Sequence, residues 1–176
     1  MGWRPLSGGG CGPAPSLPWQ PGFLHDRRTR LKTYERRIVI ERAPEQVFEV
    51  LTNPTKVKSW NPDIVRLEPL ADGPVRVGTR YSAMRDVGGK MRTAEMEVTV
   101  FEPPRRCGLG GTIMGVWAGY VFDLEPLPGG STRVELTAEV RGRGIGRFIE
   151  GAFVKAMQRS DAELLERLKR AVEGAA

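Results

Sequence analysis

The chain has 176 residues, of which 27 are Lys or Arg and 21 are Asp or Glu, and its formal net charge is +6. With 40% hydrophobic and 27% charged residues it has the composition of a water-soluble globular protein, which excludes collagenous, coiled-coil and wholly disordered chains. No stretch approaches the roughly 18 consecutive apolar residues that a membrane-spanning helix requires. This length predicts a single folded domain with one hydrophobic core.

The isoelectric point of about 9.7 raises the question of an anionic partner such as a nucleic acid. Residues 1–33 hold five basic residues and one acidic residue, so the rest of the chain keeps 22 basic against 20 acidic residues. No predicted element in that remainder carries a basic stripe interleaved with aromatic residues. We therefore expect no nucleic-acid partner.

Residues 1–33 contain six Gly and five Pro and show neither strand alternation nor helical periodicity. This pattern predicts a disordered basic leader, followed by a folded domain over residues 34–176. The single histidine, His25, falls in the leader, and the two cysteines, Cys11 and Cys107, are far apart. We therefore expect neither a metal site nor a cofactor, and the free cysteines with no secretory signal favour the cytoplasm.

The folded part is predicted to begin with a strand over residues 34–42, followed by two short helices. Pro44 is tolerated in a first helical turn, and an apolar stripe from Val47 to Leu51 supports a first helix there. Asn53 and Pro54 end that helix, and Asn53 is expected to cap the second, which carries Trp60 on its apolar side.

The next eighty residues predict a meander of antiparallel strands over 64–67, 80–85, 90–101, 107–113, 117–124 and 132–140. Glycines between 108 and 119 are interpreted as bulges and bends of the sheet. Apolar residues at three- and four-residue spacing predict a long amphipathic helix over 143–173. The fold class is therefore α+β, with a curved antiparallel sheet of about seven strands wrapped around a long C-terminal helix.

Four strings follow one another in this part of the chain: IVIERAPEQVFEVLTNPTKVKSWNP, VRVGTRY, VTVFEPPRRC and YVFDLEPLPGGSTRVEL. In these strings and in the order of its elements, the chain from Tyr34 to about Glu173 resembles the SRPBCC superfamily of START-like, Bet v 1-like proteins. Within it, the resemblance is to the polyketide cyclase/dehydrase and lipid-transport branch. The resemblance implies a helix-grip fold whose deep apolar cavity, between sheet and C-terminal helix, binds hydrophobic molecules. Members of the superfamily include pure binding proteins and a minority of enzymes.

Residues expected to line such a cavity come from the second short helix, the inward face of the sheet and the long helix. They are Trp60, Tyr81, Met96, Tyr120, Phe122, Phe148, Ala152, Phe153 and Met157. Ordinary core packing explains the same apolar pattern, so both interpretations stay open.

Candidates for catalysis are Tyr81, Arg85 and Tyr120, because a Tyr hydroxyl or an Arg could polarise a ketone and stabilise an enolate. For Arg85 we favour a solvated position near the end of a hairpin. The alternating pattern places Glu95 and Asp123 on the outer face of the sheet. Cys107 is interpreted as a packing residue, since no histidine is available to activate its thiol.

Three arginines, Arg141, Arg143 and Arg147, cluster where the last strand passes into the long helix. Because a helix N-terminus attracts negative charge, this cluster is a candidate site for an anionic group. Exposed arginines without a partner are the alternative.

Three functional hypotheses remain. The first is a binding module that encloses a hydrophobic small molecule, such as a lipid, a polyketide or an aromatic compound. The second is a cofactor-independent enzyme of the polyketide cyclase, aromatase or dehydrase type, with Tyr and Arg groups acting in the same cavity. The third is an interaction protein, which no feature of the sequence singles out. The sequence does not decide whether the protein is catalytic.

Overall fold

The computed structural model describes residues 32–87, 89–113, 115–142 and 146–174. Within this part the chain forms one seven-stranded antiparallel sheet and three helices. In chain order the elements are β1 (Lys32–Ile40), α1 (Pro44–Thr52), α2 (Val57–Trp60), β2 (Ile64–Pro69), β3 (Arg80–Val87), β4 (Lys90–Glu102), β5 (Arg106–Ile113), β6 (Val116–Leu127), β7 (Ser131–Gly142) and α3 (Gly146–Glu173). This architecture confirms the predicted α+β fold class.

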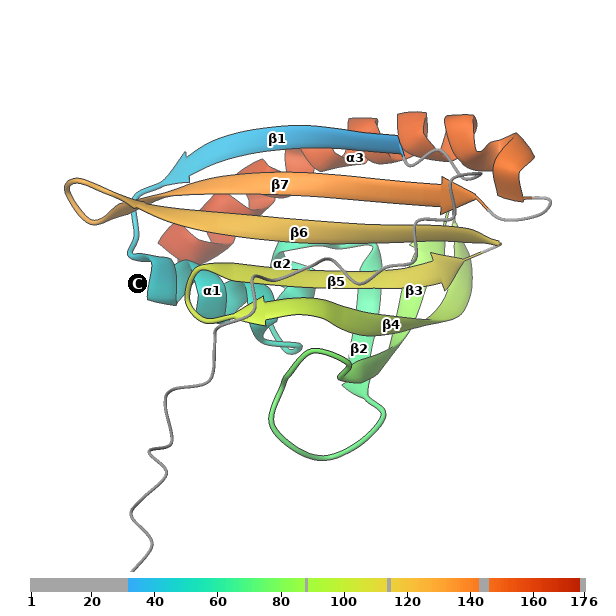
Figure 1. Cartoon of the computed structure of the whole chain (residues 1–176), viewed down its shortest axis with the longest axis horizontal. Helices are drawn as coiled ribbons and strands as arrows, with labels where there is room; N and C mark the ends of the chain where they lie inside the picture. Colours follow the sequence, from blue (N-terminus) through green and yellow to red (C-terminus); the bar gives the residue numbers. More distant parts are fainter. Residues whose placement is uncertain (1–31, 88, 114, 143–145, 175–176) are drawn as a thin grey trace, which may run out of the picture.

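The strands lie in the order β1-β7-β6-β5-β4-β3-β2, so only the β1–β7 pair joins strands that are not consecutive. Short connections join the successive strands from β3 to β7, whereas the longer loop over residues 70–79 joins β2 to β3 (Figure 1). Figure 1 shows the sheet in front of all three helices, with α3 crossing behind it and its C-terminal end beside α1. The concave face of the sheet and the helices therefore enclose the core between them.

The two short helices begin and end where local chemistry requires. Pro44 opens α1, and the helix ends where the backbone N–H of Asn53 donates to the carbonyl oxygen of Glu49. The expectation that Asn53 caps α2 is wrong, because α2 begins four residues later, at Val57, without a side-chain cap. The Asn53 side chain instead accepts the backbone N–H of Thr55 at 3.0 Å, which closes a turn ahead of α2.

The core follows from strand alternation on one side and helical periodicity on the other. On β7 every second residue from Thr132 to Val140 is buried, while the intervening residues are half-buried. On α3 the buried stripe consists of Asp161, Leu164, Leu165, Leu168 and Val172. One carboxylate, Asp161, is thus part of an otherwise apolar inward stripe.

Polar contacts hold the C-terminal end of α3 against β1 and the two residues that follow it. The Glu173 carboxylate accepts the backbone N–H of Glu41 at 2.9 Å, and the Arg42 guanidinium donates to the Glu173 carbonyl oxygen at 2.9 Å. The Lys169 ammonium donates to the Val39 carbonyl oxygen at 3.0 Å.

The N-terminal half of α3 packs differently. Its Phe153, Val154 and Met157 rest on a second, smaller apolar cluster formed by Val116, Ala118 and Val140. The two halves of the helix therefore have separate packing partners.

Parts of the predicted organisation lie outside the described residues. These are residues 1–31 of the expected leader and the start of the expected long helix at 143–145. Lys32 and Thr33, expected in the leader, belong to β1, where they pair with Val140 and Glu139. Among the residues described, no helix is long and apolar enough to span a membrane.

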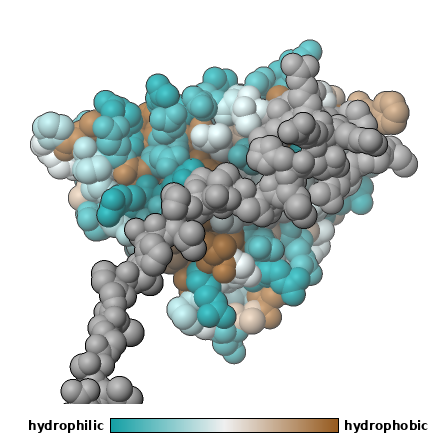
Figure 2. All heavy atoms as spheres, in the orientation of Figure 1, coloured by the Kyte–Doolittle hydropathy of each residue, from teal (hydrophilic) through white to brown (hydrophobic). Residues whose placement is uncertain are grey.

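The part of the sheet's outer face that is visible in Figure 2 is mostly hydrophilic, with some hydrophobic side chains between the polar ones. Its ion pairs join neighbouring strands, as between Arg80 and Glu95 and between Arg106 and Asp123. The prediction that Glu95 and Asp123 lie on the outer face is thereby confirmed.

A single aromatic residue, Trp117, lies across the glycines of this convex face. A Cβ atom added at Gly119 would come within 2.6 Å of the indole, and one at Gly110 within 2.7 Å. The register between β5 and β6 runs without a shift, so these two glycines make room for an indole ring and do not form bulges there. The guanidinium of Arg141 covers the ring at 5.4 Å from its centroid.

We predict that Gly119→Ala destabilises the protein by about 1 kcal/mol or more, because the new methyl group displaces the indole. In a Trp117→Ala background the same change is expected to be neutral or stabilising, since Ala is otherwise the better strand residue. Urea unfolding of the four proteins of this double-mutant cycle measures the coupling. Equal effects of Gly119→Ala in both backgrounds would refute the close contact.

Candidate functional site

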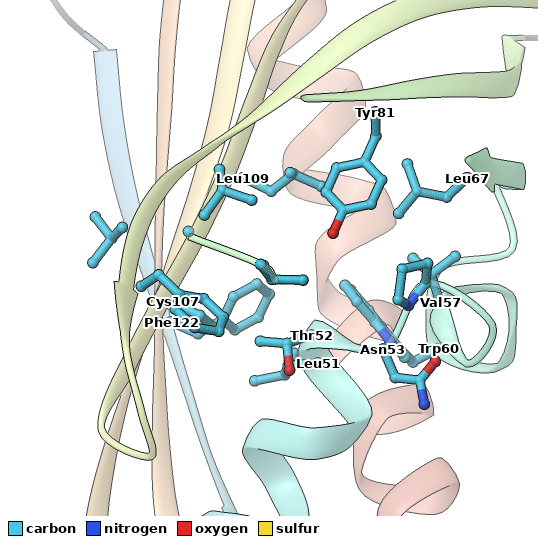
Figure 3. A pocket seen from close by; sticks show the side chains of 16 residues that line it. Leu51, Thr52, Asn53, Val57, Trp60, Leu67, Tyr81, Cys107, Leu109 and Phe122 are labelled. Carbon is cyan, nitrogen blue, oxygen red and sulfur yellow. The ribbon is translucent and has the colours of Figure 1, made fainter. Parts of the chain in front are cut away.

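The concave side of the sheet holds a first cavity of about 60 Å³, which we name the α1 cavity. It lies between α1, α2 and strands β3 to β6 (Figure 3). Its lining residues are mostly apolar: Leu51, Thr52, Asn53, Pro54, Val57, Trp60, Leu67, Val75, Tyr81, Val98, Val100, Phe101, Cys107, Gly108, Leu109 and Phe122.

A second cavity of about 50 Å³ lies under the N-terminal half of α3, and we name it the α3 cavity. Unlike the α1 cavity, it is lined by a charged side chain, that of Arg85. Its lining residues are Trp60, Asn61, Ile64, Arg85, Met96, Leu109, Ala118, Tyr120, Phe122, Phe153 and Met157.

The two cavities share a wall of three side chains, Trp60, Leu109 and Phe122. The rings of Trp60 and Phe122 meet edge to face, with their centroids 5.9 Å apart. Each cavity is smaller than the roughly 150 Å³ that holds a benzene molecule in a protein core. A ligand with an aromatic ring therefore has to displace part of this wall or of the helix above it.

The polar groups of the α1 cavity stay uncharged at neutral pH. The Tyr81 hydroxyl points into the cavity (Figure 3), and burial raises its pKa above the ordinary value. Burial, and secondarily the charge of Asp123, raises the pKa of the Cys107 thiol to about 12. A protonated thiol is a poor nucleophile, which agrees with the interpretation of Cys107 as a packing residue.

The α3 cavity is bordered by two N–H donors without a partner. The Nε atom of Arg85 and the Nε1 atom of Trp60 are both buried and form no hydrogen bond with any described residue. The expectation that Arg85 lies in water is therefore wrong: it shares the inward side of β3 with Tyr81 and Ala83, and its long side chain reaches the cavity. Buried donors of this kind favour a ligand that offers an acceptor.

Next to this cavity lies a polar cluster that the sequence pattern did not reveal, consisting of Tyr34, Tyr120 and Asp161. The Tyr120 hydroxyl donates to Oδ1 of Asp161 at 2.9 Å, and the Tyr34 hydroxyl donates to Oδ2. Asp161 is fully buried. We call these three residues the Asp161 cluster.

The strand register explains how the Asp161 cluster forms. Tyr34 on β1 and Tyr120 on β6 both pair with the same residue of the intervening strand, Ala138. Their strands are therefore about 10 Å apart, with a small, fully buried side chain between them. A carboxylate from α3 fits over the alanine and reaches both hydroxyls.

The environment of the cluster shifts the pKa values of all three groups upward. Burial raises the pKa of Asp161, while the two tyrosine hydrogen bonds and the charge of Arg36 act in the opposite direction. Burial, followed by the hydrogen bond to Asp161, raises the pKa of Tyr34 far above its ordinary value. Burial and the charge of Asp161 do the same for Tyr120. Both tyrosines therefore keep their protons at neutral pH.

Of the residues expected to bind ligand, seven line at least one cavity: Trp60, Tyr81, Met96, Tyr120, Phe122, Phe153 and Met157. The other two do not, because the Phe148 side chain is 90% exposed and Ala152 is also exposed. Phe148 precedes Phe153 by five residues, which rotates it by about 140° around the helix, away from the sheet. Phe148 and Ala152 therefore do not line either cavity.

Sequence reasoning missed Tyr34 and Asp161. The signal for Asp161 was present, since it follows Met157 by four residues and precedes Leu165 by four, in phase with the inward stripe of α3. Tyr34 shares the inward side of β1 with Ile38 and Ile40. Tyr34 and Asp161 come into contact only because β1 pairs with β7. This pairing joins the two ends of the domain and cannot be predicted from a local sequence pattern.

The expected anion site near the start of α3 is not assembled by the described residues. Arg141 lies on the convex face against Trp117, and the side chains of Arg143 and Arg147 lie outside the description. Within the described residues, no group of three or more His, Cys, Asp or Glu side chains is arranged to hold a metal ion.

Solved structures with the same fold are numerous. The aromatase/cyclase Zhui from Streptomyces sp. R1128 aligns with a TM-score of 0.68 at 16% identity, covering 82% of this chain and 94% of that protein. Norcoclaurine synthase from Thalictrum flavum, in complex with dopamine and hydroxybenzaldehyde, aligns with a TM-score of 0.63 at 13% identity, covering 91% of this chain and 96% of that protein. Ara h 8.0201 aligns with a TM-score of 0.64 at 14% identity, covering 82% of this chain and 99% of that protein.

At these identities the structural likeness shows the shared fold and no shared activity. No curated protein matches the chain significantly in sequence. The sequence profile of one family, described as polyketide cyclase / dehydrase and lipid transport, matches residues 32–173. That range runs from the start of β1 to the end of α3 and contains both cavities and the Asp161 cluster. The chain therefore belongs to the polyketide cyclase/dehydrase and lipid transport family.

Proposed function

We propose that the protein binds a hydrophobic small molecule that carries an oxygen acceptor. Its apolar body would occupy the α1 cavity, and its oxygen would face Arg85 and Trp60 in the α3 cavity. The observation that carries this proposal is the pair of buried N–H donors without partners on the border of an apolar space.

The energetic argument concerns the cost of those donors. A buried donor without a partner costs about 1–3 kcal/mol, and a ligand oxygen that accepts from it recovers that free energy. Burial of the ligand's apolar body adds roughly 25 cal/mol for each Å² removed from water. A molecule that combines the two features therefore gains from both cavities at once.

Access requires movement, because neither cavity alone holds an aromatic ring. The N-terminal half of α3 is the element best suited to move, since the polar contacts with β1 hold the opposite end of the helix. Its two cavity-lining side chains are Phe153 and Met157, and Met adapts readily to irregular shapes. Outward movement of this half would enlarge the α3 cavity first.

We predict that Arg85→Met lowers affinity for an oxygen-bearing ligand by about 10- to 100-fold, because a charged hydrogen bond is lost while the apolar volume stays similar. The ligand is first identified by native mass spectrometry of the freshly purified protein, or from a panel of lipids and aromatic ketones by thermal shift. Isothermal titration calorimetry then measures the affinity.

The matched control is Arg80→Met, which changes an exposed arginine on the outer face of the same strand. It is expected to leave the affinity unchanged. The proposal fails if no hydrophobic molecule co-purifies and none of the panel binds. It also fails if both arginine variants weaken binding equally.

Replacing Phe122 with Leu should connect the two cavities, because it trims one of the three side chains of their common wall. We predict a loss of about 1–2 kcal/mol of stability without ligand, and a gain in affinity for ligands with one additional ring. Phe48→Leu is the control: this buried residue packs against Phe101 and lines neither cavity. Equal ligand preferences in the two variants would contradict the role of the wall.

A second candidate function is cyclase-type catalysis, and the observation that favours it is the Asp161 cluster beside the α3 cavity. In such a reaction Arg85 would stabilise the oxygen of a developing enolate. The proton removed from the substrate carbon would pass to the Tyr120 oxygen as the Tyr120 proton moves to Asp161. Positioning of a reactive chain within the cavity would supply the rest of the rate enhancement.

For this candidate we predict that the protein accelerates closure of a linear diketone to a six-membered cyclic enone, with loss of water. Asp161→Asn should lower kcat by about 100-fold with little change in KM, since it removes a proton acceptor and no binding group. Product formation is followed by ultraviolet absorbance of the enone. Binding of the diketone without any acceleration would leave the binding function standing and exclude this catalytic one.

A further inference from the structure

The Asp161 cluster constrains which ligand atoms the α3 cavity accepts. An ionised carboxylate is a hydrogen-bond acceptor only, so it takes the protons of both hydroxyls that reach it. The Tyr120 hydroxyl donates to Oδ1 and the Tyr34 hydroxyl to Oδ2 of Asp161. Neither tyrosine therefore has a proton left to give to a ligand.

Tyr120 nevertheless borders the α3 cavity. Because its one proton is directed at Asp161, its oxygen can offer the cavity only lone pairs. A tyrosine in this state acts as a hydrogen-bond acceptor, whereas a tyrosine with a free hydroxyl rotates to donate or accept as required. Asp161 thus fixes the hydrogen-bonding direction of Tyr120.

Of the other polar residues that line this cavity, Arg85 and Trp60 offer hydrogen atoms, and the Asn61 amide can donate or accept. The Nε atom of Arg85 and the Nε1 atom of Trp60 are donors without partners. The α3 cavity therefore presents donors from β3 and α2 and an acceptor from β6. A carbonyl or ether oxygen satisfies only the donors, while a hydroxyl satisfies both kinds of group.

From this complementarity we infer that the ligand carries a hydroxyl group, and that Tyr120, held by Asp161, selects it over a carbonyl. The hydroxyl proton goes to the Tyr120 oxygen, and the ligand oxygen accepts from Arg85 or Trp60. This inference rests on the proposed binding function and names the ligand chemistry of the same cavity. Asp161 and Tyr34 act as positioning residues, because neither lines the cavity.

Burial of Asp161 supports this assignment. A fully buried carboxylate costs free energy that two neutral hydroxyls offset only in part, as the upward shift of its pKa indicates. An apolar residue at this place in the inward stripe of α3 would pack without that cost. The carboxylate thus lowers the stability of the fold, and its contribution is to fix the hydrogen-bonding direction of Tyr120.

Three small probes of nearly equal size test the inference: p-cresol, p-fluorotoluene and p-tolualdehyde. They offer a hydroxyl, no strong hydrogen-bonding group, and an acceptor only. We expect the wild-type protein to bind p-cresol about 10-fold more tightly than p-tolualdehyde, as measured by nuclear magnetic resonance titration at pH 7. This comparison requires no variant to fold.

A pair of matched variants locates the effect. In Tyr120→Phe the preference for p-cresol over p-tolualdehyde is expected to fall below about threefold, because the acceptor is gone. Thr132→Val removes a buried hydroxyl that donates to the Arg42 carbonyl oxygen and lines neither cavity, and it is expected to keep the full preference.

The outcomes separate the inference from the function on which it rests. If the wild-type protein binds p-cresol and p-tolualdehyde with similar affinity and both more tightly than p-fluorotoluene, or binds p-tolualdehyde most tightly, the inference is overturned and the proposed function stands. If p-fluorotoluene binds as tightly as the other two probes, the oxygen requirement of the proposed function fails as well. Loss of the preference in Thr132→Val as well as in Tyr120→Phe would also overturn the inference. If none of the probes and no member of the broader panel binds, the proposed function itself fails.

Discussion

The interaction on which the interior depends is the pair of hydrogen bonds from Tyr34 and Tyr120 to the Asp161 carboxylate. It joins the first strand, the sixth strand and the last helix at one point, over the small side chain of Ala138. Any rotation of α3 that withdrew Asp161 would leave an ionised carboxylate in an apolar interior, which costs several kcal/mol. The cluster thereby fixes the rotation of α3 relative to the sheet.

This anchoring divides α3 into two functional parts. Beyond Asp161, three leucines and Val172 pack into the main core, and Glu173 is bound to the end of β1. Before Asp161, the helix rests on a separate small cluster and covers the α3 cavity. The exposed Phe148 belongs to the same part. A helix fixed at its middle and its end can open at its beginning without disturbing the core, which suits a ligand that must displace side chains to enter.

Much of this architecture follows from local sequence pattern. Alternation on β7 and β4 and the three- and four-residue spacing on α3 report burial directly, and they predicted the sheet and the long helix, whereas a cavity between them was expected only from the family resemblance. Arg85, Phe148 and Asp161 were misjudged or missed for one reason. A charged residue suggests an exposed position and an aromatic residue a buried one. In the structure, however, burial is decided by the position of the residue along its strand or helix. The reach of a side chain and the pairing of β1 with β7 decide which residues meet in the interior, and a short stretch of sequence shows neither.

The two cavities differ in how their polarity is controlled, and this difference sets what the protein can recognise. In the α1 cavity Tyr81 and Cys107 stay neutral mainly through burial, so that space is suited to select shape and apolar surface. In the α3 cavity the direction of the Tyr120 hydroxyl is set by a carboxylate outside the lining, while two N–H groups await an acceptor. Apolar contacts distinguish molecules differing by a methylene only weakly, whereas an unmatched buried polar group is penalised strongly. For the proposed ligand, specificity would therefore reside mainly under α3, and affinity mainly between the sheet and the two short helices.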